Sequence, residues 1–169
     1  PAREVAQRRP GRALMAADGI DEAAAVLVTF AWPGASTIAR HLVEATLALH
    51  DDRVLDADRS IAAAAEASLG HPWIESQPDL LELAAIAAGR LGQPERAVRL
   101  AAAAEPIRLR TGVTYRWADQ DRWLAEVLAT AAEELDTAGV DEARERGATM
   151  AIAEALQLIV RGRGGRRRT

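Results

Sequence analysis

The 169-residue sequence predicts an all-α protein, and three observations lead to this prediction. Segments of helical character are separated by clusters of glycine, proline and aspartate. No run of β-branched or aromatic residues alternates with the two-residue period of a half-buried strand. Alanine, the strongest helix former, fills 39 positions. Because its side chain is small, alanine also lets helices pack closely against one another.

Eight or nine helices are expected, since the breaks leave nine segments with helical character. The predicted ranges are Ala2–Ala17, Asp21–Ala31, Ala35–His50, Leu55–Leu69, Gln77–Leu91, Pro94–Arg110, Trp117–Leu135, Asp141–Met150 and Ala151–Val160. We expect them to form one domain over residues 1–160, followed by a basic flexible linker over residues 161–169.

Residue preferences at helix ends support these limits. Pro94 suits a first helical position, where the N–H that proline lacks would have no intrahelical partner. Asp21 and Asp141 are predicted to cap helices or to lie in their first turns. Pro106 is expected to kink its helix rather than end it, because apolar residues continue beyond it. The glycines that suit helix C-terminal ends are Gly70, Gly92 and Gly112.

Helical hairpins repeat along the sequence once the glycine turns are aligned. In the clearest hairpin, the positions expected to face each other are Leu81, Ala85 and Ala88 on one helix and Ala97, Ala101 and Ala104 on the next. This pattern resembles the tetratricopeptide repeat. Since Ala24 and Ala57 lie 33 residues apart but Ala57 and Ala97 lie 40 apart, we expect antiparallel hairpins stacked as a degenerate tetratricopeptide-like superhelix. An alanine-rich antiparallel bundle is the alternative.

The residues from Leu83 to the C-terminus resemble the helical region upstream of the DNA-binding domain in large LuxR-family transcriptional regulators. The resemblance rests on the order of its segments. These are the Gly-x-Pro-Glu-Arg-Ala turn at Gly92–Ala97, then WADQDRWLAEVLATAAEEL, DEARERGATM and AIAEALQL, and finally the basic end RGRGGRRRT.

This resemblance implies an ATPase-like domain upstream, sometimes preceded by a cyclase-like domain, and a helix-turn-helix domain downstream. The sequence has no GxxxxGK[ST] phosphate loop and no lysine that could complete one. Because the chain opens at Pro1, we expect a piece of a longer protein. DNA would be contacted only through the domain that follows.

The end of the chain carries a concentrated positive charge. Five of the 21 arginines lie there, so the rest of the chain has 16 basic against 25 acidic residues, a net charge of −9. We interpret this end as a linker, and non-specific contact with phosphates is the alternative. The arginines concerned are Arg161, Arg163, Arg166, Arg167 and Arg168.

A concave groove is expected if the hairpins stack as in tetratricopeptide arrays, because the first helix of each hairpin then lines one face. By position, Thr46 and His50 of one hairpin, and Asp79, Glu82 and Arg90 of the next, would face this groove and a ligand in it. Neighbouring domains of the same polypeptide could fill the groove instead.

Two tryptophans flank the longest predicted loops. Trp73 and Trp117 would either wedge these loops onto the core or offer an aromatic patch to a partner, and we favour the wedge. Trp123 lies among apolar residues of a predicted helix and is expected in the core.

The sequence offers no pattern typical of a catalytic, cofactor-binding or metal-binding site. Cysteine is absent, which excludes disulfides and thiolate ligands. His41, His50 and His71 are not spaced as paired ligands on one helical face. The acidic run from Asp51 to Asp58 lacks the glycine and the distal glutamate of a calcium loop, so we interpret it as a capping turn. We therefore expect neither enzymatic activity nor a cofactor.

These observations favour a non-catalytic interaction and signal-relay domain of a LuxR-type regulator. Its partners would be other domains of the same polypeptide, or a protein or small-molecule inducer. The alternatives are a stand-alone tetratricopeptide-like scaffold that binds proteins and a sensor of a small ligand. Apolar stretches fall far short of the roughly 20 residues of a membrane span, and no secretory signal opens the chain, so we expect a cytoplasmic protein without membrane contact.

Overall fold

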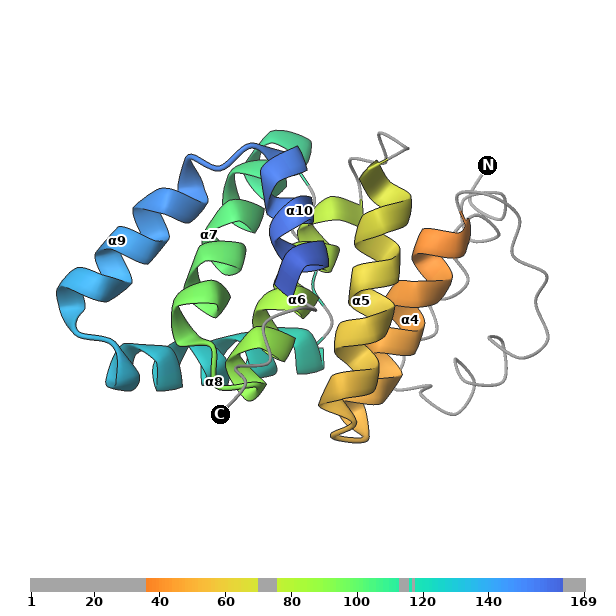
Figure 1. Ribbon diagram of the computed structural model, residues 1–169, viewed down its shortest axis with the longest axis horizontal. Coiled ribbons are helices and arrows are strands. Elements are labelled where there is room, and N and C mark those ends of the chain that lie inside the picture. Colours follow the sequence, from red (N-terminus) through yellow and green to blue (C-terminus); the bar gives the residue numbers. More distant parts are fainter. Residues whose placement is uncertain (1–35, 70–75, 113–115, 117, 163–169) are drawn as a thin grey trace.

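The computed structural model describes residues 36–69, 76–112, 116 and 118–162 (Figure 1). These ranges form helices and no strand, which confirms the all-α prediction for them. Their seven helices are α4 (Ser36–His50), α5 (Val54–Leu69), α6 (Gln77–Arg90), α7 (Pro94–Thr111), α8 (Ala118–Glu134), α9 (Thr137–Ala148) and α10 (Ile152–Gly162). The predicted helices Ala2–Ala17 and Asp21–Ala31 lie outside the described residues. Within these ranges, no helix combines the length and the apolar character needed to cross a membrane.

Helix ends follow most of the predicted signals. Pro94 is the first residue of α7, and the helix continues through Pro106 to Thr111. Gly92 and Gly112, which follow α6 and α7, have φ angles of 68° and 66°. Glycine is favoured in this left-handed region because it has no Cβ to clash with the backbone. Gly70 lies outside the described residues.

The start of α9 corrects one prediction. Asp141 does not cap this helix, which begins one turn earlier at Thr137. Asp136 is the N-cap instead, and its Oδ1 accepts a hydrogen bond of 2.7 Å from the N–H of Gly139. A good cap thus offsets the low helix propensity of Gly139.

The helices pack as two hairpins extended by three further helices (Figure 1). Helix α4 packs along α5, and α6 packs along α7. Helix α8 lies across α6 and α7, while α9 packs on the side of α7. Helix α10 turns back toward the first hairpin and packs mainly on α5. The two hairpins are therefore joined both by α6 against α5 and by α10.

Helix α6 lies at the centre of this arrangement and contacts five of the other described helices. Every residue from Gln77 to Ala88 is buried. A helix that is apolar on all sides is suited to such a position. Gln77, Asp79 and Glu82 are the polar exceptions in this stretch, and the two acids carry carboxylates into the interior.

Small residues lie where the helices approach most closely. Ala57 of α5, Ala85 of α6, and Ala97 and Ala104 of α7 are fully buried. Ala101, expected at the same contact, is only partly buried. Gly147 of α9 packs directly on the backbone of α7, where a Cβ atom would overlap the carbonyl oxygen of Arg99. Side-chain volume at these positions therefore sets the distance between helices.

Candidate functional site

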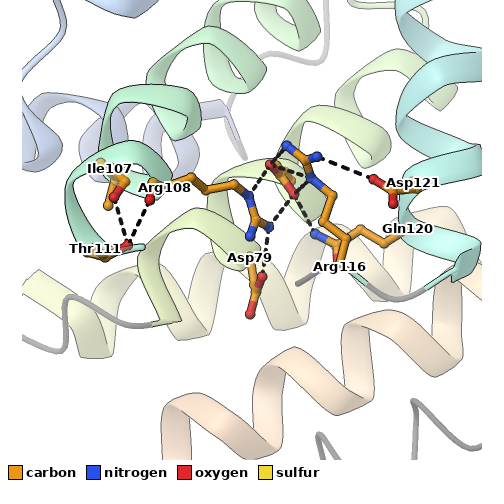
Figure 2. A network of polar contacts seen from close by, with 8 residues as sticks. Asp79, Ile107, Arg108, Thr111, Arg116, Gln120 and Asp121 are labelled. Carbon is orange, nitrogen blue, oxygen red and sulfur yellow. Dashed lines mark hydrogen bonds and ion pairs between the residues drawn. The ribbon is translucent and has the colours of Figure 1, made fainter. Parts of the chain in front are cut away.

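A cluster of charged side chains surrounds the carboxylate of Glu82 in the interior of the molecule. Figure 2 labels the surrounding residues Asp79, Arg108, Arg116, Gln120 and Asp121. Glu82 lies on α6, and its side chain is only 2% exposed. The first cation of the cluster is Arg108 of α7, whose Nε donates to Oε1 and whose Nη2 donates to Oε2 of Glu82, each at 2.6 Å. This two-pronged geometry is the strongest arrangement available to an arginine and a carboxylate.

Arg116 and Gln120 complete the shell around Glu82. Arg116 precedes α8, and its Nε lies 3.0 Å and 2.9 Å from the two carboxylate oxygens, while its Nη2 donates to Oε1 at 2.8 Å. Gln120 of α8 donates from Nε2 to Oε2 at 2.8 Å, and its own Oε1 has no hydrogen-bond partner. Each carboxylate oxygen of Glu82 therefore has three donors around it.

The cluster runs from the core to the surface. Arg108 also donates to Asp79 at 2.9 Å, and both side chains are buried. Arg116 is 30% exposed and lies 3.4 Å from the carboxylate of Asp121, which is 59% exposed. Figure 2 shows Asp79 beside Arg108 and Asp121 on the outer side of Arg116. We call these five charged residues, together with Gln120, the Glu82 network.

Electrostatics keep the network ionised. Burial raises the pKa of Glu82, but hydrogen bonds from Arg108 and Arg116 outweigh this effect and hold the pKa below its usual value. Burial lowers the pKa of Arg108, and its hydrogen bond to Glu82 reverses the direction. The hydrogen bond to Glu82 also raises the pKa of Arg116. All three groups are therefore charged at neutral pH.

This arrangement is suited to holding helices together rather than to proton transfer. A general base needs a pKa near the working pH and room for the substrate that gives up a proton. The pKa of Glu82 is lowered, and its lone pairs already accept hydrogen bonds from three side chains. The network joins α6, α7 and α8 through groups that cannot be separated without leaving a charge buried.

The residues predicted to line a groove lie in several different environments. Asp79 and Glu82 come together in the buried network, where a ligand on the surface would not reach them. Thr46 is buried, and its hydroxyl donates to the carbonyl oxygen of Leu42 at 2.9 Å. His50 is exposed at the end of α4, with its Nδ1 3.6 Å from the carboxylate of Asp51. None of these contacts tests the groove, which stays a prediction.

Arg90, at the end of α6, contacts the neighbouring helices α4 and α8. Its Nη1 donates to the carbonyl oxygen of Leu49 at the end of α4, at 2.7 Å. Its guanidinium carbon lies 4.9 Å from the ring centre of Trp123, within the range of a cation–π contact. Trp123 is buried on α8, as the sequence predicted.

Most of the predicted aromatic patch and basic tail falls outside the described residues. Trp73 and Trp117 are not among the described residues, and neither are Arg163, Arg166, Arg167 and Arg168. Arg161 is exposed on the last turn of α10, where its Nη2 donates to Gln157 at 3.3 Å. Its predicted contact with phosphates stays a prediction.

The acidic turn between α4 and α5 contains its own counterions. Arg53 lies 3.1 Å from the carboxylate of Asp51 and 3.0 Å from that of Asp56, and Asp56 also pairs with Arg59. No group of three potential metal ligands occurs anywhere in the described ranges. The acidic residues Asp51 and Asp56 of this turn therefore form local ion pairs at the start of α5.

Sequence reasoning singled out Asp79 and Glu82, but as groove residues, and it named none of their partners in the network. Arg108, Arg116 and Gln120 lie 26 to 38 residues beyond Glu82, and no local spacing relates them to it. One signal was present, since two acids inside an otherwise apolar helix are rarely buried without a counterion. That signal predicts that partners exist without saying which arginines they are.

Comparison of the chain with protein-family models, with curated proteins and with solved structures gives no match. The resemblances to LuxR-type regulators and to tetratricopeptide repeats thus rest on the residues quoted above. What the fold and the site define by themselves is an all-helical body, over the described residues, that is fastened by a buried ion network.

Proposed function

We propose that this chain is a non-catalytic interaction and signal-relay domain of a LuxR-type transcriptional regulator, acting in the cytoplasm. Its helical hairpins would stack as a degenerate tetratricopeptide-like array. The observation that carries the proposal is the succession of α6, the short turn before Pro94, α7, α8, α9 and α10, which gives each segment of the resemblance a helix in the same order. Helix α10 reaches Gly162, within the segment predicted as the basic linker.

The packing of the hairpins supports an interaction module. Helices α4 with α5, and α6 with α7, are hairpins with alanine at their contacts, and α5 packs on α6. Arrays of this kind present long helical surfaces to other molecules while each unit contacts only its neighbours. The return of α10 to α5 departs from a simple array and makes this body more closed than an open solenoid.

The Glu82 network supports a non-catalytic role. Arginines of the same chain neutralise its buried carboxylates, and these ion pairs join helices of the domain. The network is therefore explained by a structural role. A module that passes a change of state between neighbouring domains benefits from a body that moves as one unit. Fixed ion pairs across three helices favour such rigid behaviour.

The parent gene gives the first test of this proposal. We expect it to encode a helix-turn-helix domain a short linker after Thr169, and an unrelated downstream sequence would contradict the LuxR assignment. The stand-alone scaffold would then be the better description of the chain.

A reporter assay tests the relay itself. In the longer regulator, deletion of residues 36–162 should make transcription from its target promoter insensitive to the inducer. Binding of the helix-turn-helix domain to DNA in a gel-shift assay should persist. An unchanged response to the inducer after this deletion would rule out a relay through the helical body.

A further inference from the structure

One arginine links the turn between α6 and α7 to the far end of the chain. Arg96 lies in the first turn of α7, yet its Nη2 donates to the carbonyl oxygen of Ile159 on α10 at 3.3 Å. The two residues are 63 positions apart. Its Nη1 donates to the side chain of Gln93 at 2.7 Å, which braces the guanidinium from its own turn.

A glycine makes room for this contact. Gly162 is the last residue of α10, and a Cβ atom there would overlap the guanidinium carbon and both terminal nitrogens of Arg96. The arginine therefore lies directly on the backbone of Gly162. Any other residue at this position would push the guanidinium away from the helix end.

Electrostatics favour a cation at this place. The last four carbonyl groups of a helix have no intrahelical donor, and together they carry a partial negative charge. Arg96 supplies a donor to the carbonyl of Ile159, and its positive charge lies beside the C-terminal end of α10. Arg96 thus stabilises the last turn of α10 from another part of the fold.

The position is a costly one for an arginine. Its Nε is buried without a hydrogen-bond partner, and burial lowers the pKa of Arg96, an effect that the charge of Asp58 partly offsets. A buried donor without a partner costs free energy. Since burial disfavours an arginine at position 96, we infer that its contact with α10 is the interaction that offsets this unfavourable free energy.

Apolar contacts hold α10 as far as Val160, which is partly buried against the core, and Arg96 adds a polar contact to the last turn. The buried residues of α10 are Ala155, Leu156 and Ile159, and they hold the helix mainly against α5. The hydrogen bond to Ile159 and the close approach to Gly162 join the end of α10 to the α6–α7 turn.

We propose that Arg96 is a positioning residue that fixes the last turn of α10 and so sets the direction in which the chain continues after Gly162. The Arg96–Gly162 contact is then the joint through which a change at the α6–α7 turn moves the end of α10. Its use as a relay rests on the proposed function, whereas the joint itself rests on the contacts of Arg96.

Hydrogen exchange measured by mass spectrometry on the full chain tests this joint. In Arg96→Ala, amides of residues 159–162 should exchange at least about ten-fold faster, because a hydrogen bond from a charged group is lost locally. Exchange in α6 and α8 should stay as in the original chain. Gly162→Ala should give the same local change, since it displaces the guanidinium without removing the arginine.

Matched variants separate positioning from general packing. Arg96→Lys keeps the charge but loses the fork that reaches both Gln93 and Ile159, so it should restore protection only in part. Arg99→Ala is the control, because Arg99 lies on the next turn of α7, also has a buried Nε without a partner, and pairs with Glu95 instead of α10. It should leave exchange at residues 159–162 unchanged.

A distance measurement gives an independent readout of orientation. The chain has no cysteine, so spin labels can be placed at Glu133→Cys on α8 and Arg161→Cys on α10 without background. Both residues are exposed. The distribution of label distances should be broader in Arg96→Ala and Gly162→Ala than in the doubly labelled parent.

Three results would overturn the proposal. They are unchanged exchange and distances in both variants, uniformly faster exchange in all helices, and slower exchange at residues 159–162 in Gly162→Ala. None of these readouts uses DNA or an inducer. A gene without a helix-turn-helix would therefore refute the proposed function but not the role of Arg96. Unchanged hydrogen exchange in both variants would refute the role of Arg96 but not the proposed function.

Discussion

At the scale of single residues, the burial of Glu82 is made possible by charge balance. Glu82 and Asp79 carry two negative charges, and Arg108 and Arg116 carry two positive ones. An isolated carboxylate in this position would be strongly disfavoured, since burial favours its neutral form. The balance holds only while these four charges are present, because Asp121, the fifth charged residue of the network, is 59% exposed to solvent. The buried part of the network is therefore sensitive to the loss of a single charge.

Replacing Glu82 with glutamine should therefore destabilise the fold by about 3 kcal/mol, because two arginines lose the carboxylate that neutralises them. The midpoint and slope of urea unfolding would measure this loss. Glu133→Gln is the matched control, since Glu133 is exposed on α8, and it should change stability by less than about 0.5 kcal/mol. Equal stabilities of the two variants would contradict the structural role of the network.

The pH dependence of stability should carry the signature of Glu82. Its pKa in the folded state is lowered, while its unfolded value is about 4.3. The stabilisation from its ionised form is therefore complete above about pH 4.3 and is lost as the pH falls through the folded-state pKa. Below about pH 4.3, the unfolding free energy of the original chain should fall more steeply than that of Glu82→Gln. Parallel curves from urea unfolding at a series of pH values would show that Glu82 contributes nothing.

At the scale of elements, small residues decide how near two helices can lie. Helix α9 has few large apolar residues and buries only Ala143 and Gly147. It approaches α7 at Gly147, where no atom larger than hydrogen fits over the carbonyl of Arg99. Close backbone approach thus replaces large side chains as the source of packing contacts.

Gly147→Ala should destabilise the protein by about 1–3 kcal/mol, because the added methyl group overlaps backbone that cannot move aside cheaply. The higher helix propensity of alanine would offset only about 1 kcal/mol of this loss. Thermal unfolding followed by circular dichroism provides the measurement. Glu145→Ala changes an exposed residue of the same helix and should leave stability nearly unchanged. A stabilised Gly147→Ala variant would show that α7 and α9 can separate at little cost.

At the scale of the whole molecule, α10 closes the arrangement of helices. It follows α9 in the chain but packs chiefly on α5, more than 80 residues earlier in the sequence. The end of the described chain and its first hairpin therefore stabilise each other. Local unfolding of α10 should therefore destabilise α5 and not α9, its neighbour in the sequence.

Ile159→Ala tests this long-range coupling. The side chain of Ile159 is almost fully buried, so its truncation should cost about 2–5 kcal/mol. Hydrogen exchange should accelerate in both α5 and α10, because the two helices share this contact. Gln157→Ala, on the exposed side of α10, is the control. Faster exchange confined to α10 would show that the first hairpin does not depend on it.

The helices themselves were predictable, and the network was not. Helical periodicity, Pro94 and the turn glycines act within a few residues of one another, so the limits of α6 and α7 agree with the prediction to within one residue. The start of α9 was missed because Gly139 weakens the local signal and only the cap by Asp136 restores it. The aromatic patch and most of the basic tail lie outside the described residues and keep their standing as predictions.

The sequence by itself determined the class of the fold, the positions of the helices and the alanines at their contacts, because these depend on local propensity and spacing. Only the tertiary structure decided that Arg108, Arg116 and Gln120 surround Glu82, and that Arg96 reaches the end of α10. The reason is that a long arginine can pair with any carboxylate or helix end that folding brings near. Which one it meets depends on how the helices pack, not on its neighbours in the chain.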